Sequence, residues 1–194
     1  MSPPSPARVR RIAVIGTSGS GKTTFARRIA AAIGAPQVEL DGLFHGPNWT
    51  PAERDVFRAR VSDAIAAPGW VTDGNYSSYL RDLIWPAADV LVWLDYPFRI
   101  VIWRLFLRTM RRGLRRQELW NGNRESLRSH FFTRQSLFLW AWNTHWKHRR
   151  DWTEIFASPE MVHVRVVRVR RPRDADAWLR RLAADRLPVL TNDN

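Results

Sequence analysis

An octapeptide near the N-terminus, Gly-Thr-Ser-Gly-Ser-Gly-Lys-Thr at residues 16–23, constrains the fold more than any other feature of the sequence. It follows the apolar run Ile12–Ile15 and precedes a segment of helical character, Thr24–Ile33. The glycines let successive backbone N–H groups turn toward one anion, and the N-terminus of the following helix faces the same anion. A strand, a phosphate-binding loop and a helix in this order predict one unit of a parallel α/β sheet.

The spacing of this loop predicts binding of a nucleoside triphosphate, with ATP and Mg²⁺ as the expected ligands. Lys22 would bring a positive charge to the β- and γ-phosphates, and the Thr23 hydroxyl would ligate the Mg²⁺. We expect the nucleotide to contact every residue of the loop and the first residue after it: Gly16, Thr17, Ser18, Gly19, Ser20, Gly21, Lys22, Thr23 and Thr24.

Apolar and amphipathic segments alternate along the rest of the chain, which predicts a doubly wound α/β sheet in a single domain. Strands are expected at residues 10–15, 37–41, 70–73, 89–95 and 161–169, and helices at 24–33, 51–67, 98–117, 125–150 and 174–185. Thr50, Pro51 and Glu53 have the spacing of a capping box at a helix start. Loops or turns are expected at 42–48, 74–75 and 118–124, with a flexible start at 1–9 and a frayed tail at 187–194.

Composition excludes several classes of protein. The chain has no cysteine, so disulfides and thiolate metal sites are excluded. Its apolar runs are shorter than the ~18 residues that a membrane span needs, and residues 1–11 lack the apolar core of a secretory signal. We therefore expect a cytoplasmic protein without a membrane partner; the sequence does not indicate an oligomeric state.

Positive charge is concentrated in one segment. The chain has a formal net charge of +13, and residues 99–150 hold thirteen Lys or Arg against two Glu, which is +11 of that total. Arg104, Arg108, Arg111 and Arg115 follow one helical face. This stripe is interpreted either as a solvated face or, since so few acids accompany it, as a surface for a polyanion.

Three aspartates are candidates for chemistry because each follows an apolar strand. Asp73 is a candidate for holding a Mg²⁺-bound water, and Asp95 is its competitor for that role. Asp41 would lie at the sheet edge where open α/β proteins bind ligands, and its carboxylate would orient or deprotonate a substrate hydroxyl.

The aromatic residues between Phe131 and Trp152 alternate with arginines. Such a pattern can form a stacking platform for nucleic acid, but packing between helices explains it more simply. His130, His145 and His148 lack the spacing to acids that a metal site requires.

Several short motifs resemble those of P-loop kinases of the adenylate-kinase and shikimate-kinase type, and within that group the topology modulation, or adenylate-kinase-like, proteins. The resemblance spans nearly the whole chain. It is carried by Gly16–Thr23, Glu39–Asp41, Leu43–His45, Asn48-Trp49, Val71–Tyr76, Leu94–Pro97 and the pair Arg104 and Arg108.

This resemblance implies a three-layer α/β/α fold with a five-stranded parallel sheet in the order 2-3-1-4-5 and a helical, Arg-rich lid over 99–150. It favours Asp73 over Asp95 for Mg²⁺, since adenylate kinases carry Asp-Gly-Phe-Pro-Arg where this chain has Asp73-Gly74. It also implies that Arg104 stacks on the adenine, that Arg108 reaches the nucleotide phosphates, and that Asp41 meets the substrate hydroxyl.

One departure from the pattern concerns the phosphoryl acceptor. Asn75-Tyr76-Ser77 replaces Phe-Pro-Arg, so the arginine that grips the acceptor phosphate in nucleotide kinases is missing, and Arg54, Arg58 and Arg81 are the possible substitutes. The leading interpretation is a kinase that moves the γ-phosphoryl of Mg·ATP to a small-molecule or nucleotide acceptor. The alternatives are an ATP-binding regulator that contacts DNA through 99–150, and an NTPase without an acceptor.

Overall fold

A five-stranded, all-parallel sheet organises the part of the chain that the structure describes, residues 9–115, 121, 137–161 and 164–184 of a computed structural model. The strands are β1 (Arg11–Gly16), β2 (Gln37–Glu39), β3 (Trp70–Asp73), β4 (Val90–Leu94) and β5 (Arg165–Val169). Their order is β2-β3-β1-β4-β5, so the predicted sheet order and fold class are confirmed.

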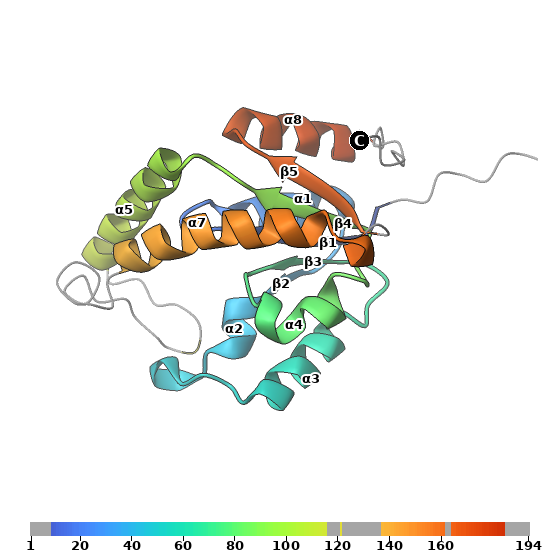
Figure 1. The fold of residues 1–194 in the computed structure, drawn as a ribbon. Helices are drawn as coiled ribbons and strands as arrows, with labels where there is room; N and C mark the ends of the chain where they lie inside the picture. The colour runs from blue at the N-terminus through green and yellow to red at the C-terminus, as the bar shows by residue number, and fades with distance from the viewer. Residues whose placement is uncertain (1–8, 116–120, 122–136, 162–163, 185–194) are drawn as a thin grey trace, which may run out of the picture.

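Helices cover both faces of the sheet (Figure 1). On one face, α1 (Lys22–Ile33) and α8 (Pro172–Ala183) pack on one another and on the strands. The other face is covered by α3 (Arg54–Ala64), α4 (Ser77–Ile84) and α7 (Leu137–Phe156). Because strand side chains alternate, Ile12 and Val14 enter the first core and Ala13 and Ile15 enter the second.

The remaining elements lie between the strands in the sequence, and two of them follow the carboxyl ends of β2 and β4. The short helix α2 (Leu40–Phe44) follows β2, and a 3₁₀ turn, η1 (Pro47–Trp49), follows α2; a second 3₁₀ turn, η3 (Pro159–Met161), precedes β5. Helix α5 (Phe98–Arg115) follows β4 and packs against α7. Among the helices described, none combines the length and the apolar character that crossing a membrane requires.

The segment between β2 and β3 differs from the prediction. Strand β2 ends at Glu39, and α3 begins at Arg54 with no side-chain cap. Pro51 instead forms a β-bridge with His45, and the Thr50 hydroxyl donates to the Pro47 carbonyl. The capping-box prediction is therefore wrong, because these residues close the loop after α2 and do not cap the N-terminus of α3.

The helical segments were predicted with mixed success. Helices α2 and α4 were missed, α2 because residues 42–48 were expected to form a loop. Helix α7 continues to Phe156 although the prediction ended it at residue 150. Residues 125–136 of that predicted helix, and the turn at 118–120 and 122–124, lie outside the described residues. Core packing is confirmed for Trp152, which is 2% exposed, but it is wrong for Trp142 and Trp146, which are 52% and 49% exposed.

Candidate active site

The loop between β1 and α1 has a backbone that only glycine adopts easily at two positions. Gly19 and Gly21 have φ of 88° and 91°, and Gly21 is the residue from which α1 starts. A Cβ atom on Gly19 would lie 2.7 Å from the carbonyl oxygen of Val101 in α5. The glycines thus allow the backbone path of the loop, and the loop packs against the first turns of α5.

Lys22 lies at the centre of the site. Its Nζ donates hydrogen bonds to the carbonyls of Gly16 at 2.7 Å and Thr17 at 3.4 Å. Burial lowers the pKa of Lys22 to about 8, while the negative charges of Asp41 and Asp73 act in the opposite direction. Both candidate carboxylates therefore lie close enough to Lys22 to interact with its charge.

Asp73 ends β3 and pairs with Val14, so the sheet brings its carboxylate beside the loop. The side chain is 5% exposed, and burial raises its pKa to about 6 even though a hydrogen bond from Thr23 and the charge of Lys22 stabilise the ionised form. One oxygen, Oδ1, is buried without a hydrogen-bond partner. Hard oxygen ligands of this kind suit Mg²⁺, which takes one or two protein groups and completes its shell with waters and phosphates.

The described residues include no cluster of three His, Cys, Asp or Glu that would hold a metal unaided.

Asp95, the competing carboxylate, is engaged elsewhere. It is 3% exposed, accepts a hydrogen bond from Nε of Arg168 at 2.8 Å, and forms an ion pair with Nη2 of the same residue at 2.7 Å. Arg149 of α7 approaches its other oxygen at 3.3 Å, and the Arg168 guanidinium lies 4.2 Å from the centre of the Trp93 ring. Asp95 thus ties β4 to β5 and α7, which is a structural role.

Asn75, which stands where adenylate kinases carry the phenylalanine of Phe-Pro-Arg, binds the loop itself. Its Nδ2 donates to the Gly16 carbonyl at 2.6 Å, and its Oδ1 accepts from the Gly16 N–H at 3.1 Å. Both backbone groups of Gly16 are therefore held by one amide side chain. The sequence placed this residue in a turn and in a family motif, but did not predict its contact with the loop.

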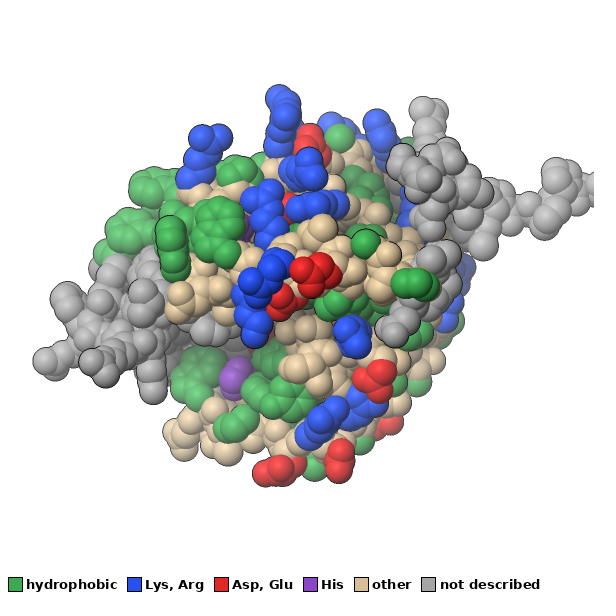
Figure 2. Space-filling view, viewed as in Figure 1, with side chains coloured by type: hydrophobic (Ala, Val, Ile, Leu, Met, Phe, Trp, Pro, Cys, Tyr) green, Lys and Arg blue, Asp and Glu red, His purple; other side chains and the backbone are tan. Residues whose placement is uncertain are grey.

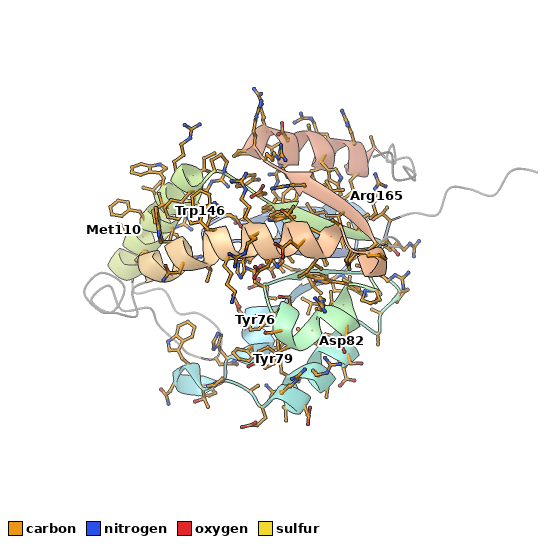
Figure 3. All side chains as sticks on the ribbon, viewed as in Figure 1. Tyr76, Tyr79, Asp82, Met110, Trp146 and Arg165 are labelled. Atoms are coloured by element: carbon orange, nitrogen blue, oxygen red, sulfur yellow. The ribbon has the colours of Figure 1, made fainter. Side chains whose placement is uncertain are left out.

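Asp41 lies in the first turn of α2 rather than at the end of a strand, which corrects its predicted position. Its Oδ1 accepts a hydrogen bond from the Tyr76 hydroxyl at 2.7 Å. Burial and the neighbouring carboxylate raise the pKa of Tyr76, so the tyrosine stays a donor. Figure 3 shows Tyr76 near α2 and α4, and its ring contacts Phe44 of α2 and Phe57 of α3.

The three arginines considered for the acceptor phosphate lie in different environments. Arg58 bonds Asp82 at 2.8 and 2.7 Å and also the Tyr79 carbonyl, and the Arg54 guanidinium lies 5.9 Å from the centre of the Tyr79 ring. Arg81 lines a small cavity together with Asn75, Tyr76 and Trp152. Of the three, Arg81 is the one that adjoins the residues around the loop.

Arg104 and Arg108 both lie over the phosphate-binding loop. Arg104 Nη1 donates to the Ser20 carbonyl at 3.0 Å, and its guanidinium lies 5.2 Å from the centre of the Tyr96 ring. Arg108 Nη2 lies 3.5 Å from Ser18 Oγ. Helix α5 therefore brings two cations to the loop, while Arg115 lies where no side chain is described.

Helix α7 adds two histidines that sequence reasoning considered only as metal ligands. His145 is 2% exposed, and its Nδ1 lies 3.2 Å from the Thr17 hydroxyl. His148 stacks on Trp152, with ring centres 4.5 Å apart, and burial together with the charge of Lys22 lowers its pKa to about 4. Their separation of three residues, which puts both on one helical face, was the available signal.

Comparison with known proteins gives a structural relative but no sequence family. No family model matches the chain, and no curated protein matches it. Among solved structures, a gluconokinase from Sinorhizobium meliloti 1021 is similar over 92% of this chain and 97% of that protein, with 24% identity and a TM-score of 0.50. This similarity agrees with the P-loop kinase fold of the described residues.

Proposed function

We propose that this protein is an ATP-dependent phosphotransferase that moves the γ-phosphoryl group of Mg·ATP to a small-molecule or nucleotide acceptor. The observation that carries the proposal is the convergence of four kinds of group on one loop: the amine of Lys22, the Thr23 and Asp73 oxygens, the two arginines of α5, and the carboxylate of Asp41. The fold of the gluconokinase relative supports the same class of reaction.

In the donor half, the residues act by position and charge. Backbone N–H groups of the loop after Gly16 and of the start of α1 would hold the phosphates, and Lys22 would leave the Gly16 and Thr17 carbonyls to meet them. Arg104 and Arg108 would neutralise charge that develops on the transferred group. Mg²⁺, when bound by Thr23 and Asp73, supplies further charge neutralisation at the β- and γ-phosphates.

In the acceptor half, Asp41 would orient a hydroxyl of the acceptor and take its proton. The Tyr76 hydrogen bond fixes the carboxylate in place, and ring contacts of Phe44 with His45 and Tyr76 pack the wall beside it. Asn75 would hold the start of the loop in register with this wall. Arg81 is our candidate for contact with a negatively charged group on the acceptor.

We also propose that the chain is most similar in kind to the topology modulation, or adenylate-kinase-like, proteins. A DNA-contacting regulator gains no support from the residues described, whereas the arrangement of Asp41 beside Lys22 favours a phosphotransferase over an NTPase that lacks an acceptor.

The test is a coupled assay of ADP release with Mg·ATP and a panel of nucleosides, nucleoside monophosphates, sugar acids and polyols. We expect at least one acceptor to accelerate ADP release and to become labelled from γ-phosphate-labelled ATP. Asp41→Asn, which keeps the side-chain size, should lower the rate by about 10²–10⁴-fold, as loss of a general base does, without weakening ATP binding. ATP hydrolysis that no acceptor accelerates would contradict the proposal.

A further inference from the structure

Exposed aromatic and aliphatic side chains gather on α5 and α7, away from the contacts described above. Among the described residues, most of the large hydrophobic side chains that are exposed lie on these two helices. We call the following set the tryptophan face: Trp103, Phe106, Leu107, Trp142 and Trp146. Figure 2 shows hydrophobic side chains gathered over this end of the molecule.

Ring contacts link these side chains within each helix and join one helix to the other. Trp103 stacks with Phe106 at a ring-centre distance of 6.0 Å, and Trp142 meets Trp146 at 6.4 Å. Phe98, at the start of α5, contacts Trp142 of α7 at 5.0 Å. Trp103 and Trp142 are 60% and 52% exposed, so their rings are available to a partner.

Cations flank this surface along the same helical rows. Arg99, Trp103, Leu107 and Arg111 succeed one another at intervals of four residues on α5, and all four are exposed. On α7, Trp142 and Trp146 are followed at the same interval by Arg150, which lies 3.4 Å from Asp151. Helix α5 contains no Asp or Glu at all.

Charge and ring chemistry together decide between possible partners. A second copy of the chain would bring the flanking arginines of both copies face to face, and like charges brought together oppose such a pairing. Nucleic acid would satisfy the arginines, but base stacking uses aromatic ring faces and leaves the exposed aliphatic side chain of Leu107 without a partner. An anionic bilayer surface suits both the aromatic rings and the arginines, because tryptophans favour the membrane interface and arginines bind its anionic headgroups.

We propose that the tryptophan face docks on the surface of a membrane that contains anionic lipids. This inference departs from the sequence-based expectation of no membrane partner, which rested on the lack of apolar spans. Docking places the apolar rings at the level of the headgroups and crosses no bilayer. It does not rest on the proposed phosphotransferase activity.

The test is co-sedimentation of the full-length protein with vesicles of phosphatidylcholine alone and with one part in three of phosphatidylglycerol. We expect binding to the anionic vesicles and little to the neutral ones. The double variant Trp103→Ser/Trp142→Ser should lose roughly tenfold or more in partition coefficient, because the apolar contribution to membrane binding is removed. The matched control Trp49→Ser, an exposed tryptophan near α2, should bind like the wild type.

Each result bears on the proposal. Arg99→Gln/Arg111→Gln should also weaken binding and reduce its dependence on salt. Equal binding of wild type and Trp103→Ser/Trp142→Ser would overturn the proposal, because charge alone would then explain the association. Absence of vesicle binding would also overturn it. So would either of two results obtained without vesicle binding: a wild-type dimer that is lost in the double variant, or duplex DNA binding that depends on these tryptophans. Thermal unfolding and the ATP-induced shift in Tm of the variants verify that each is folded.

Discussion

Gly19→Ala tests whether the phosphate-binding loop is held against α5 as described. Gly19 has φ of +88°, and a Cβ there would lie 2.7 Å from the Val101 carbonyl oxygen and 3.0 Å from the Leu105 Cβ. A left-handed backbone costs an alanine about 1–2 kcal/mol, and forcing an atom into a packed site adds about 1–3 kcal/mol. We expect the free energy of unfolding to fall by about 2–5 kcal/mol, measured by urea denaturation.

Gly34→Ala is the matched control. Gly34 caps α1 with φ of +67°, and a Cβ there would meet nothing within 4 Å. Its substitution should cost only the backbone contribution, about 1–2 kcal/mol. The difference between the two variants isolates the contact with α5 and corresponds to about 2–4 °C in Tm per kcal/mol for a chain of this length. Equal destabilisation by the two substitutions would refute the described packing of α5 on the loop.

Three further predictions concern single side chains. Burial lowers the pKa of His148 to about 4 from 6.5, so this residue stabilises the fold above pH 6.5 and that contribution is lost as the pH falls; the loss between pH 7.5 and 5 should be about 2 kcal/mol. Urea melts of His148→Gln should show a flatter pH dependence, and an unchanged one would count against the buried neutral imidazole. Asp95→Asn should lower the free energy of unfolding by about 1–3 kcal/mol, because it removes the charge that Arg168 and Arg149 pair with, while calorimetry shows Mg²⁺-dependent ATP binding unchanged; a loss of Mg²⁺ dependence would show that Asp95 belongs to the metal site. Asn75→Ala removes both hydrogen bonds to Gly16 and should cost about 1–3 kcal/mol and weaken ATP binding, whereas wild-type affinity would show that the loop needs no such support.

The donor half of the site could be predicted from the sequence because its information is local. The spacing of Gly16 to Thr23 fixes a strand, a loop and a helix start within one short segment, and the apolar runs identify the remaining strands of the sheet. Since parallel strands meet at one edge, Asp73 was placed beside the loop without knowledge of its contacts.

The remainder depends on contacts between distant segments. His145 lies 128 residues from Thr17 in the sequence, and only the packing of α7 brings the two together. Asp95 had the same local pattern as Asp73, and its ion pairs with Arg168 and Arg149 were not readable from that pattern. The helix start at Thr50 was wrong for a related reason, since the pairing of Pro51 with His45 overrides the local capping signal.

The central claim is that the loop at residues 16–23 binds the phosphates of ATP through Lys22. Isothermal titration of the protein with ATP and Mg²⁺ tests it most directly, because the chain offers a matched pair: Lys22 and Lys147, its two lysines. We predict that wild type and Lys147→Ala bind ATP with the same affinity. Lys22→Ala should bind ATP at least about tenfold more weakly, as loss of a charge-assisted hydrogen bond to phosphate implies. ATP affinity that is equal in wild type and Lys22→Ala would contradict the account.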